Sequence, residues 1–415
     1  MELRSKLSTL KVVRHVYIYF LSYFFNAGLS FLTIWLLTNS LKPEDYGIIN
    51  LYASFISLLT PFVTGGILYP LSVEYYKRSR TSYQQFFTNA QVIPLLSLGI
   101  LTIICIIFRN PIAHFVRVTP IWVIVLPITV WWVMNNEITM MICRVMNKPW
   151  GFAGFAIGKN ITEILLTITL VIGLHWAWQG RLLSGVVAPV IVGIFSIRFF
   201  YRWHFVAKGI EWKQVQHIAW VSVPFIFERL TVFVLSNSDR YFIDKYDLNG
   251  TAQVGLYSVG GQIATIITLV ILSMNSAYQP YVFQNLASGH RERARKGTGM
   301  FILAAALLVG CLFLAIPILF QFFIGHQFRG AQVFAYYLCG GNFMWAIYNA
   351  FLAYLLFHGK NRLILYLSLS GMIVSVILNF ILVPHYGAYG AAMTNIITYS
   401  LLALLSVTYS WKYFK

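Results

Sequence analysis

Residues 95–108 read LLSLGILTIICIIF, a run without a single charged side chain. A transmembrane β-strand alternates apolar and polar residues, whereas this run is apolar almost throughout. A helix needs about 20 mainly apolar residues to cross a bilayer, and the apolar stretch extends back to about residue 86. The stretch therefore predicts a transmembrane α-helix, and the rest of the chain repeats the pattern.

The composition excludes most other classes of protein. Hydrophobic residues make up 59% of the 415-residue chain and charged residues only 10%, whereas a soluble domain carries about 25% charged residues. A soluble enzyme, a disordered protein and a secreted disulfide scaffold are therefore excluded. The four cysteines lie in apolar runs, so we expect small buried side chains rather than a disulfide framework. The predicted fold class is an all-α polytopic membrane protein.

The length accommodates about twelve transmembrane helices, at about 35 residues for each span and its loop. A hydrophilic connector at about residues 203–216 divides them at the midpoint of the chain. We expect two six-helix bundles around a central cavity, with residues 1–208 in the N-terminal bundle and residues 209–415 in the C-terminal one. The predicted spans are 14–38, 46–72, 86–108, 119–144, 150–174, 182–202, 217–241, 251–286, 297–324, 331–357, 362–384 and 389–411.

The distribution of basic residues supports this topology. With the N-terminus inside, alternate loops place 21 of the 30 Lys and Arg on the inner side and 7 on the outer side, which leaves Lys159 and Arg229 within spans. Such an excess follows the positive-inside rule and predicts that both termini are cytoplasmic. Most of the net charge of +18 is then explained by topology and not by a nucleic-acid partner.

The two halves share weak sequence similarity. The second span opens with YGIINLY at residues 46–52, and the eighth opens with VGLYS at residues 254–258, each after a short charged loop. Repeated halves are typical of transporters in which one half rocks against the other.

Charged residues within spans are the main functional candidates, since such residues usually face a cavity or a partner. Lys159 and Glu163 are four residues apart, so they share a helix face and form either a self-neutralising pair or part of a site. Glu228 and Arg229 are neighbours about 100° apart on their helix, so at least one needs another helix or water. Arg229 is the strongest candidate for a functional residue.

Two acidic residues complete the set of candidates for a coupling ion or a charge pair. Glu137 lies seven residues before Arg144, so it either pairs with that arginine or binds a coupling ion. Asp239 ends the seventh span at the expected outer surface, where charges are common. Neither an ATP-binding P-loop nor a metal-binding cluster nor a nucleophile motif occurs, so no cofactor, metal or catalytic residue is predicted.

Three segments resemble the Wzx-type O-antigen flippases, from the polysaccharide-transport branch of the multidrug/oligosaccharidyl-lipid/polysaccharide exporter superfamily. The segments are LKPEDYG at 41–47, DRYFID at 239–244 leading to VGLYS at 254–258, and NFILVPHYGAYGAA at 379–392. The resemblance implies two six-helix bundles that open alternately to each side. It also implies a basic cavity lining, for which Lys159 and Arg229 within the spans and Arg144 and Arg14 at the inner mouth are the candidates.

The resemblance further implies a substrate, namely an oligosaccharide repeat unit on undecaprenyl pyrophosphate that moves from the cytoplasmic to the periplasmic leaflet of the inner membrane. Possible partners are a polysaccharide polymerase and a chain-length regulator. Glu137, Glu163, Glu228 or Asp239 could bind a proton or sodium counter-ion.

Three other functions are compatible with a polytopic membrane protein. A drug or cation antiporter of the same superfamily needs acidic cavity residues without adjacent bases, whereas Glu163 and Glu228 each have a basic neighbour. A polysaccharide polymerase or glycosyltransferase needs a larger outer loop than any found here. A scaffold that transports nothing would leave the charges within the spans unexplained.

Overall fold

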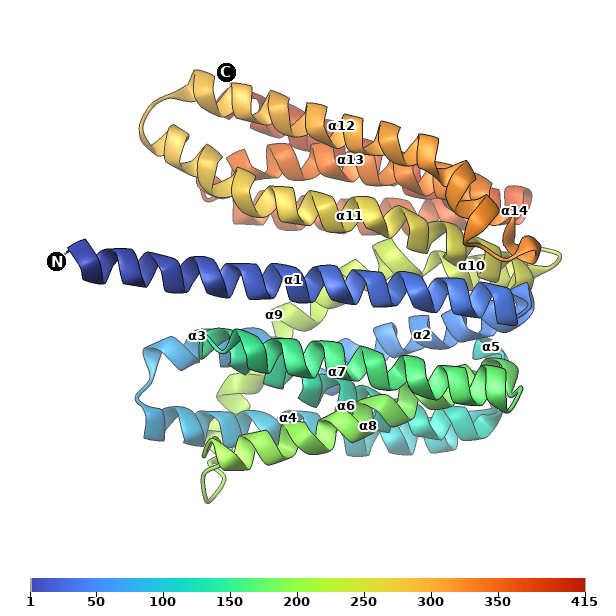
Figure 1. The fold of residues 1–415 in the computed structure, drawn as a ribbon, viewed down its shortest axis with the longest axis horizontal. Helices are drawn as coiled ribbons and strands as arrows, with labels where there is room; N and C mark the ends of the chain where they lie inside the picture. The colour runs from blue at the N-terminus through green and yellow to red at the C-terminus, as the bar shows by residue number, and fades with distance from the viewer. Residues whose placement is uncertain (1, 415) are drawn as a thin grey trace. The chain divides into compact units, whose positions relative to one another are not determined.

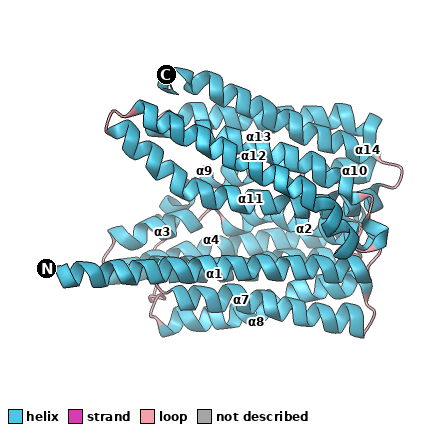
Figure 2. Cartoon of the chain, turned by 45° about the horizontal axis from the view of Figure 1, so that its top comes forward, coloured by secondary structure: helices cyan, strands magenta, loops and turns pink. Residues whose placement is uncertain are grey.

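The structure is a computed structural model. It describes residues 2–414, and it describes the side chains of residues 17–19 and 21–414. Across these residues the secondary structure is helical, with short connecting loops (Figure 2). The elements are α1 (Glu2–Ser40), α2 (Pro43–Thr64), α3 (Leu68–Lys77), α4 (Arg80–Ile107), α5 (Arg109–Val116), α6 (Pro120–Val145), α7 (Pro149–Thr167), the π-helix η1 (Ile168–Gly173), α8 (Ala177–Arg202), α9 (Trp212–Asn237), α10 (Asp239–Tyr246), α11 (Gly250–Ala287), α12 (Arg291–Phe322), the 3-10 helix η2 (His326–Phe328), α13 (Ala331–Phe357) and α14 (Asn361–Phe414).

Within the described residues, ten helical stretches are long and apolar enough to cross a membrane. One of them, α14, contains both of the last two predicted spans, which meet at a kink where Gly387 has φ 54° and ψ −137°. α13 adds a further 27 residues without a charged side chain, which is long enough to span. The prediction of an all-α polytopic membrane fold is confirmed.

The chain folds into two compact units. The first comprises residues 1–40 and 51–230, and the second comprises residues 41–50 and 231–415. One boundary falls at the end of α1, and the other two fall inside α2 and inside α9. The split at residues 208 and 209 into two six-helix bundles was drawn from loop hydrophilicity, and it stays a prediction.

Several helices end in the same hydrogen-bonded C-cap. At the end of α8, the N–H of His204 donates to the carbonyl of Tyr201 at 3.0 Å and the N–H of Phe205 to that of Phe200 at 2.9 Å. These two bonds define a Schellman motif, which needs a left-handed residue after the cap, and His204 supplies it with φ 49°. α6 ends in the same way at Asn147, while α11 and α13 use glycine.

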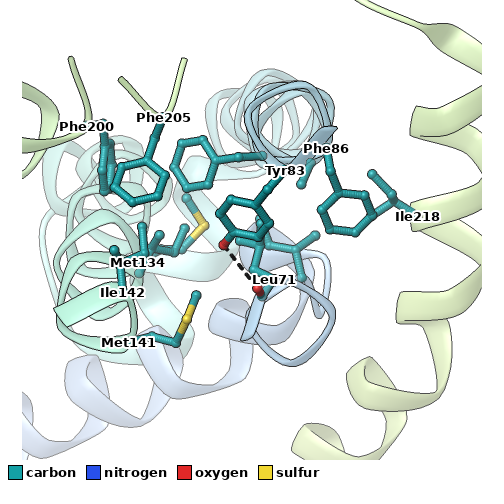
Figure 3. Packing of buried hydrophobic residues seen from close by; sticks show 13 residues of the cluster. Leu71, Tyr83, Phe86, Met134, Met141, Ile142, Phe200, Phe205 and Ile218 are labelled. Carbon is teal, nitrogen blue, oxygen red and sulfur yellow. Dashed lines mark hydrogen bonds between the residues drawn. The ribbon is translucent and has the colours of Figure 1, made fainter. Parts of the chain in front are cut away.

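The first unit has a compact core where α3, α4, α6 and α8 meet (Figure 3). A buried hydroxyl stabilises it, since Tyr83 Oη donates to the Leu71 carbonyl at 3.0 Å. The cluster consists of buried aromatic and aliphatic side chains: Ile67, Leu71, Tyr83, Phe86, Phe87, Ala90, Met134, Ile138, Met141, Ile142, Phe200, Phe205 and Ile218.

In the second unit, α11, α12 and α13 run side by side (Figure 1). A buried hydroxyl network joins them. Tyr278 Oη donates to the Ala350 carbonyl at 2.8 Å and lies 2.9 Å from the Thr298 hydroxyl, which is 2.8 Å from Tyr354 Oη. Each hydroxyl of this network thus has a partner, as a low-dielectric interior requires.

Candidate functional site

A three-residue ion cluster links α7 and α8 of the first unit. Glu163 Oε1 lies 2.6 Å from Arg181 Nη2, and Glu163 Oε2 lies 3.8 Å from Lys159 Nζ. The Glu163 and Arg181 side chains are 17% and 18% exposed. Arg181 also donates to Thr167 Oγ1 at 3.2 Å and to Ser184 Oγ at 3.3 Å. The carboxylate is therefore held mainly by Arg181, which leaves the Lys159 ammonium less tightly engaged.

Arg181 is one of the seven basic residues that the expected topology places on the outer side, so this contact was not predicted. η1 extends α7 to Gly173, and the chain then reverses at residues 174–176 before α8 begins at Ala177. Glu163 lies 12 residues before His175 and Arg181 six residues after it, so equal spacing from the turn does not pair them. The packing of α7 against α8 and the long Arg181 side chain bring the two charges together, and no signal in the sequence identifies this contact.

Glu137 on α6 brings the other candidates of this unit together. Its carboxylate interacts electrostatically with Arg229, Lys159 and Arg144. The neighbouring Asn136 fixes this part of α6 against α8, since its amide donates to the Pro189 carbonyl at 3.2 Å. Three basic candidates, from α6, α7 and α9, therefore lie within electrostatic range of one carboxylate.

Arg229 and Glu228 are both exposed. Arg229 Nε lies 3.7 Å from Glu228 Oε2, and each side chain is 62% exposed. Arg229 lies within a predicted span but is not buried, because no described neighbour covers this face of α9. A charged side chain so exposed on a membrane-spanning helix usually faces a water-filled space.

Arg144 lies beside a group of aromatic rings. Its guanidinium is 5.8 Å from the centre of the Phe152 ring, and the Tyr19 and Tyr23 rings lie 5.3 and 5.5 Å from the same ring. Arg14 belongs to α1, but its side chain lies outside the described part of the structure.

Asp239 lies in the second unit, where its hydrogen bonds are with residues of that unit. Tyr257 Oη donates to its carboxylate, and the Arg240 backbone N–H donates to it at 2.9 Å. Arg240 Nε reaches Ser258 Oγ at 3.1 Å. Burial raises the pKa of the Asp239 carboxyl in spite of the adjacent Arg240.

Four basic and three acidic side chains of the first unit interact with one another and together carry a net charge of +1. Cations gathered in this way attract a phosphate-bearing group, and the carboxylates hold them in place. No group of three or more His, Cys, Asp and Glu able to hold a metal occurs among the described residues. The set consists of Arg144, Lys159, Arg181 and Arg229 with Glu137, Glu163 and Glu228.

The segments that carry the family resemblance meet in the second unit, where they serve packing. A Cβ on Gly47 would overlap the Thr251 carbonyl oxygen, and a Cβ on Gly255 would overlap that of Pro43. The N-terminal segments of α2 and α11, which are similar in sequence, therefore cross at Gly47 and Gly255. Asp247 also accepts a hydrogen bond from the Ala388 N–H at 3.0 Å.

Solved structures with this fold are membrane transporters by their titles. An inward-facing multidrug resistance MATE family transporter of the MOP superfamily aligns with a TM-score of 0.74 at 14% identity, over 94% of each chain. The lipid II flippase MurJ, in an inward closed conformation, aligns with a TM-score of 0.72 at 16% identity, over 95% of this chain and 87% of that one. At these identities the likeness shows the fold.

The family follows from the sequence comparison. The model of the polysaccharide biosynthesis protein family matches residues 12–286 and that of the MatE family residues 224–381. The chain belongs to the polysaccharide biosynthesis protein family, and the predicted resemblance is confirmed at that level.

Named relatives agree with this assignment. The chain is 23% identical to Lsg locus putative protein 1 of Haemophilus influenzae, over 88% of this chain and 90% of the relative. It is 19% identical to the succinoglycan biosynthesis transport protein ExoT of Rhizobium meliloti, over 71% of this chain and 59% of the relative.

Proposed function

We propose that this protein is a flippase for lipid-linked oligosaccharides, and specifically that it moves undecaprenyl-pyrophosphate-linked O-antigen repeat units from the cytoplasmic to the periplasmic leaflet by alternating access. The observation that carries the proposal is the set of cations around Glu137 on membrane-spanning helices, in a chain of the polysaccharide biosynthesis family. A pyrophosphate and its sugars cannot cross about 30 Å of hydrocarbon unaided. Exposed cations on these helices supply the attraction that the headgroup needs.

The roles of the individual residues follow from their contacts. Arg181 neutralises Glu163, so Lys159 retains a positive charge for the pyrophosphate. Arg229 is exposed, so its planar guanidinium can bind phosphate oxygens in a bidentate manner. The rings of Tyr19, Tyr23 and Phe152 beside Arg144 supply apolar faces for sugars.

The location and partners belong to the same proposal. The protein would lie in the inner membrane with both termini cytoplasmic, and it would deliver repeat units to a polymerase and its chain-length regulator. Asp239, a buried carboxyl of the second unit that Tyr257 contacts, is our candidate for a coupling site.

A drug or cation antiporter is the competing function, and the MatE match over residues 224–381 favours it. The carboxylates weigh against it. Glu163 is bound by Arg181, Glu137 faces three cations, and Glu228 contacts Arg229. A cationic drug would have to compete with these internal partners.

The test is a deletion strain of the native host, with surface polysaccharide and the leaflet location of undecaprenyl-linked repeat units as the two readouts. We expect loss of long surface chains, with intact repeat units trapped on the cytoplasmic side. Unpolymerised repeat units in the outer leaflet would identify a polymerase instead. Unchanged polysaccharide together with lost drug resistance would identify an antiporter.

Complementation then tests the residues. Lys159→Ala and Arg229→Ala should each lower export at least tenfold, because a charge-assisted hydrogen bond contributes about 1.5–3 kcal/mol. Lys213→Ala is the matched control, since it removes an exposed cation from the start of the same helix as Arg229. Export at wild-type levels in both test variants would refute the cationic site.

A further inference from the structure

A basic cavity lies where helix ends meet in the first unit, and Glu137, Lys159 and Arg229 are not among its lining residues. Its volume is about 250 Å³, and it is formed where the connection from α3 to α4 meets the ends of α6 and α8. At about 30 Å³ for each water molecule, it has room for about eight. Tyr75, Arg78, Arg80, Tyr83, Trp203 and His204 are among its lining residues.

Two arginines from the same turn provide its charge. Arg78 Nε lies 2.6 Å from Glu74 Oε2, and the guanidinium lies 4.5 Å from the centre of the Phe86 ring, so its position is fixed. Arg80 Nη2 donates to the Trp203 carbonyl at 3.4 Å. Within the contacts of the described residues, most of the five N–H donors of Arg80 remain available for a ligand.

A third cation, Lys148, lies against the ring of Trp203, which lines the cavity. Lys148 Nζ lies 2.7 Å from the centre of the Trp203 ring. Burial lowers the pKa of this ammonium, and the nearby Arg202 lowers it further. The lining residues given for the cavity include Arg78 and Arg80 but no Asp or Glu, and Glu74 contacts Arg78 from outside the lining, so the cavity suits an anion.

The cavity is rigid because of what surrounds it. The Schellman motifs at the ends of α6 and α8 fix Lys148, Trp203 and His204, and Gln84 Nε2 donates to the His204 carbonyl at 2.5 Å. Tyr83 and Phe205, which also line it, belong to the hydrophobic core of this unit (Figure 3). A site built on a packed core loses little entropy when it binds.

We infer that this cavity binds a phosphate group, with Arg78 and Arg80 as its ligands and the Trp203 and Tyr75 rings enclosing it. The source of the phosphate is either the headgroup of an anionic membrane lipid or a soluble phosphate ester. The turns that form the cavity lie on the predicted cytoplasmic side, where basic and aromatic residues meet anionic headgroups. The site is independent of the proposed flippase site, and neither requires the other.

The test measures binding to the purified full-length protein by native mass spectrometry. Phosphatidylglycerol is the anionic probe, phosphatidylcholine the zwitterionic reference, and inorganic phosphate the soluble competitor. Arg80→Gln removes the donor and should weaken phosphatidylglycerol binding about tenfold, since a hydrogen bond to a charged group has that effect. Arg80→Lys keeps the charge and should retain most of the binding. Arg293→Gln, which removes an exposed cation of α12, is the matched control.

Two results support the site and identify the source of the ligand. Binding that depends on Arg80 and resists inorganic phosphate indicates a lipid headgroup, whereas binding that inorganic phosphate displaces indicates a soluble phosphate ester. Equal binding by the wild type and by Arg80→Gln would overturn the inference, and so would an equal loss in the Arg293→Gln control. Folding is checked by the melting profile of each variant, and Arg80→Ala, which also removes the guanidinium, serves as the test if Arg80→Gln does not fold.

Discussion

Removing Arg181 should destabilise the protein through Glu163. Arg181→Gln keeps a polar side chain but breaks the 2.6 Å contact with the carboxylate. Loss of one partner from a buried ion pair costs about 3–5 kcal/mol, because the other charge remains buried. Lys159 remains 3.8 Å from the other carboxylate oxygen and still stabilises the charge in part. We therefore expect the free energy of unfolding to fall by about 3 kcal/mol, the lower end of this range.

A second variant makes this reasoning refutable. The double variant Arg181→Gln with Glu163→Gln has no buried carboxylate left without a partner, so it should be more stable than Arg181→Gln alone. The assay is unfolding of the purified protein by titration with sodium dodecyl sulfate. Arg109→Gln, which removes an exposed arginine from the same unit, should change the free energy by less than about 0.5 kcal/mol. If the double variant were as unstable as Arg181→Gln or less stable, the buried carboxylate would not be the cause.

Three further predictions concern stability in the same assay. Gly255→Ala should cost about 1–3 kcal/mol, because the new Cβ overlaps a backbone oxygen, whereas Gly154→Ala, with open space around its Cβ position, should be neutral or stabilising; equal effects would contradict the close helix crossing. Tyr83→Phe removes the hydrogen bond to Leu71 and should cost about 1 kcal/mol, and no change would mean that this bond contributes nothing to stability. Burial raises the pKa of Asp239 above the unfolded value of about 3.9. The contribution of Asp239 to the free energy of unfolding is then full below the unfolded pKa and is lost as the pH rises through the folded pKa. The wild type should therefore lose stability relative to Asp239→Asn between these two pKa values, and parallel pH profiles of the two proteins would argue against this prediction.

The membrane fold could be read from the sequence because it depends on composition along each segment. A span such as residues 86–108 is defined by its own apolar residues, whatever it packs against. The kink at Gly387 within α14 also falls between two predicted spans, since the glycine that permits it is local. The Lys159–Glu163 contact was predicted for the same reason, because helical periodicity alone brings residues four apart together.

The partners of the candidate residues could not be read in this way. Glu163 binds Arg181 because α7 packs against α8 after the turn at residues 174–176, whereas hydropathy places Arg181 in an outer loop. Arg229 lies within a hydrophobic helix yet is exposed, which depends on which helices cover α9. Loop lengths and helix neighbours decide such contacts, and hydropathy does not record them.

The sequence by itself therefore determined the fold class, the approximate spans and the family resemblance, because hydrophobicity and short motifs are properties of single segments. Only the tertiary structure decided which charges meet, namely four cations and three carboxylates gathered in the first unit and Asp239 held by Tyr257 in the second. It also decided that the glycines of the resembling segments serve helix crossing. The physical reason is that a contact depends on two segments at once, and packing chooses which segments meet.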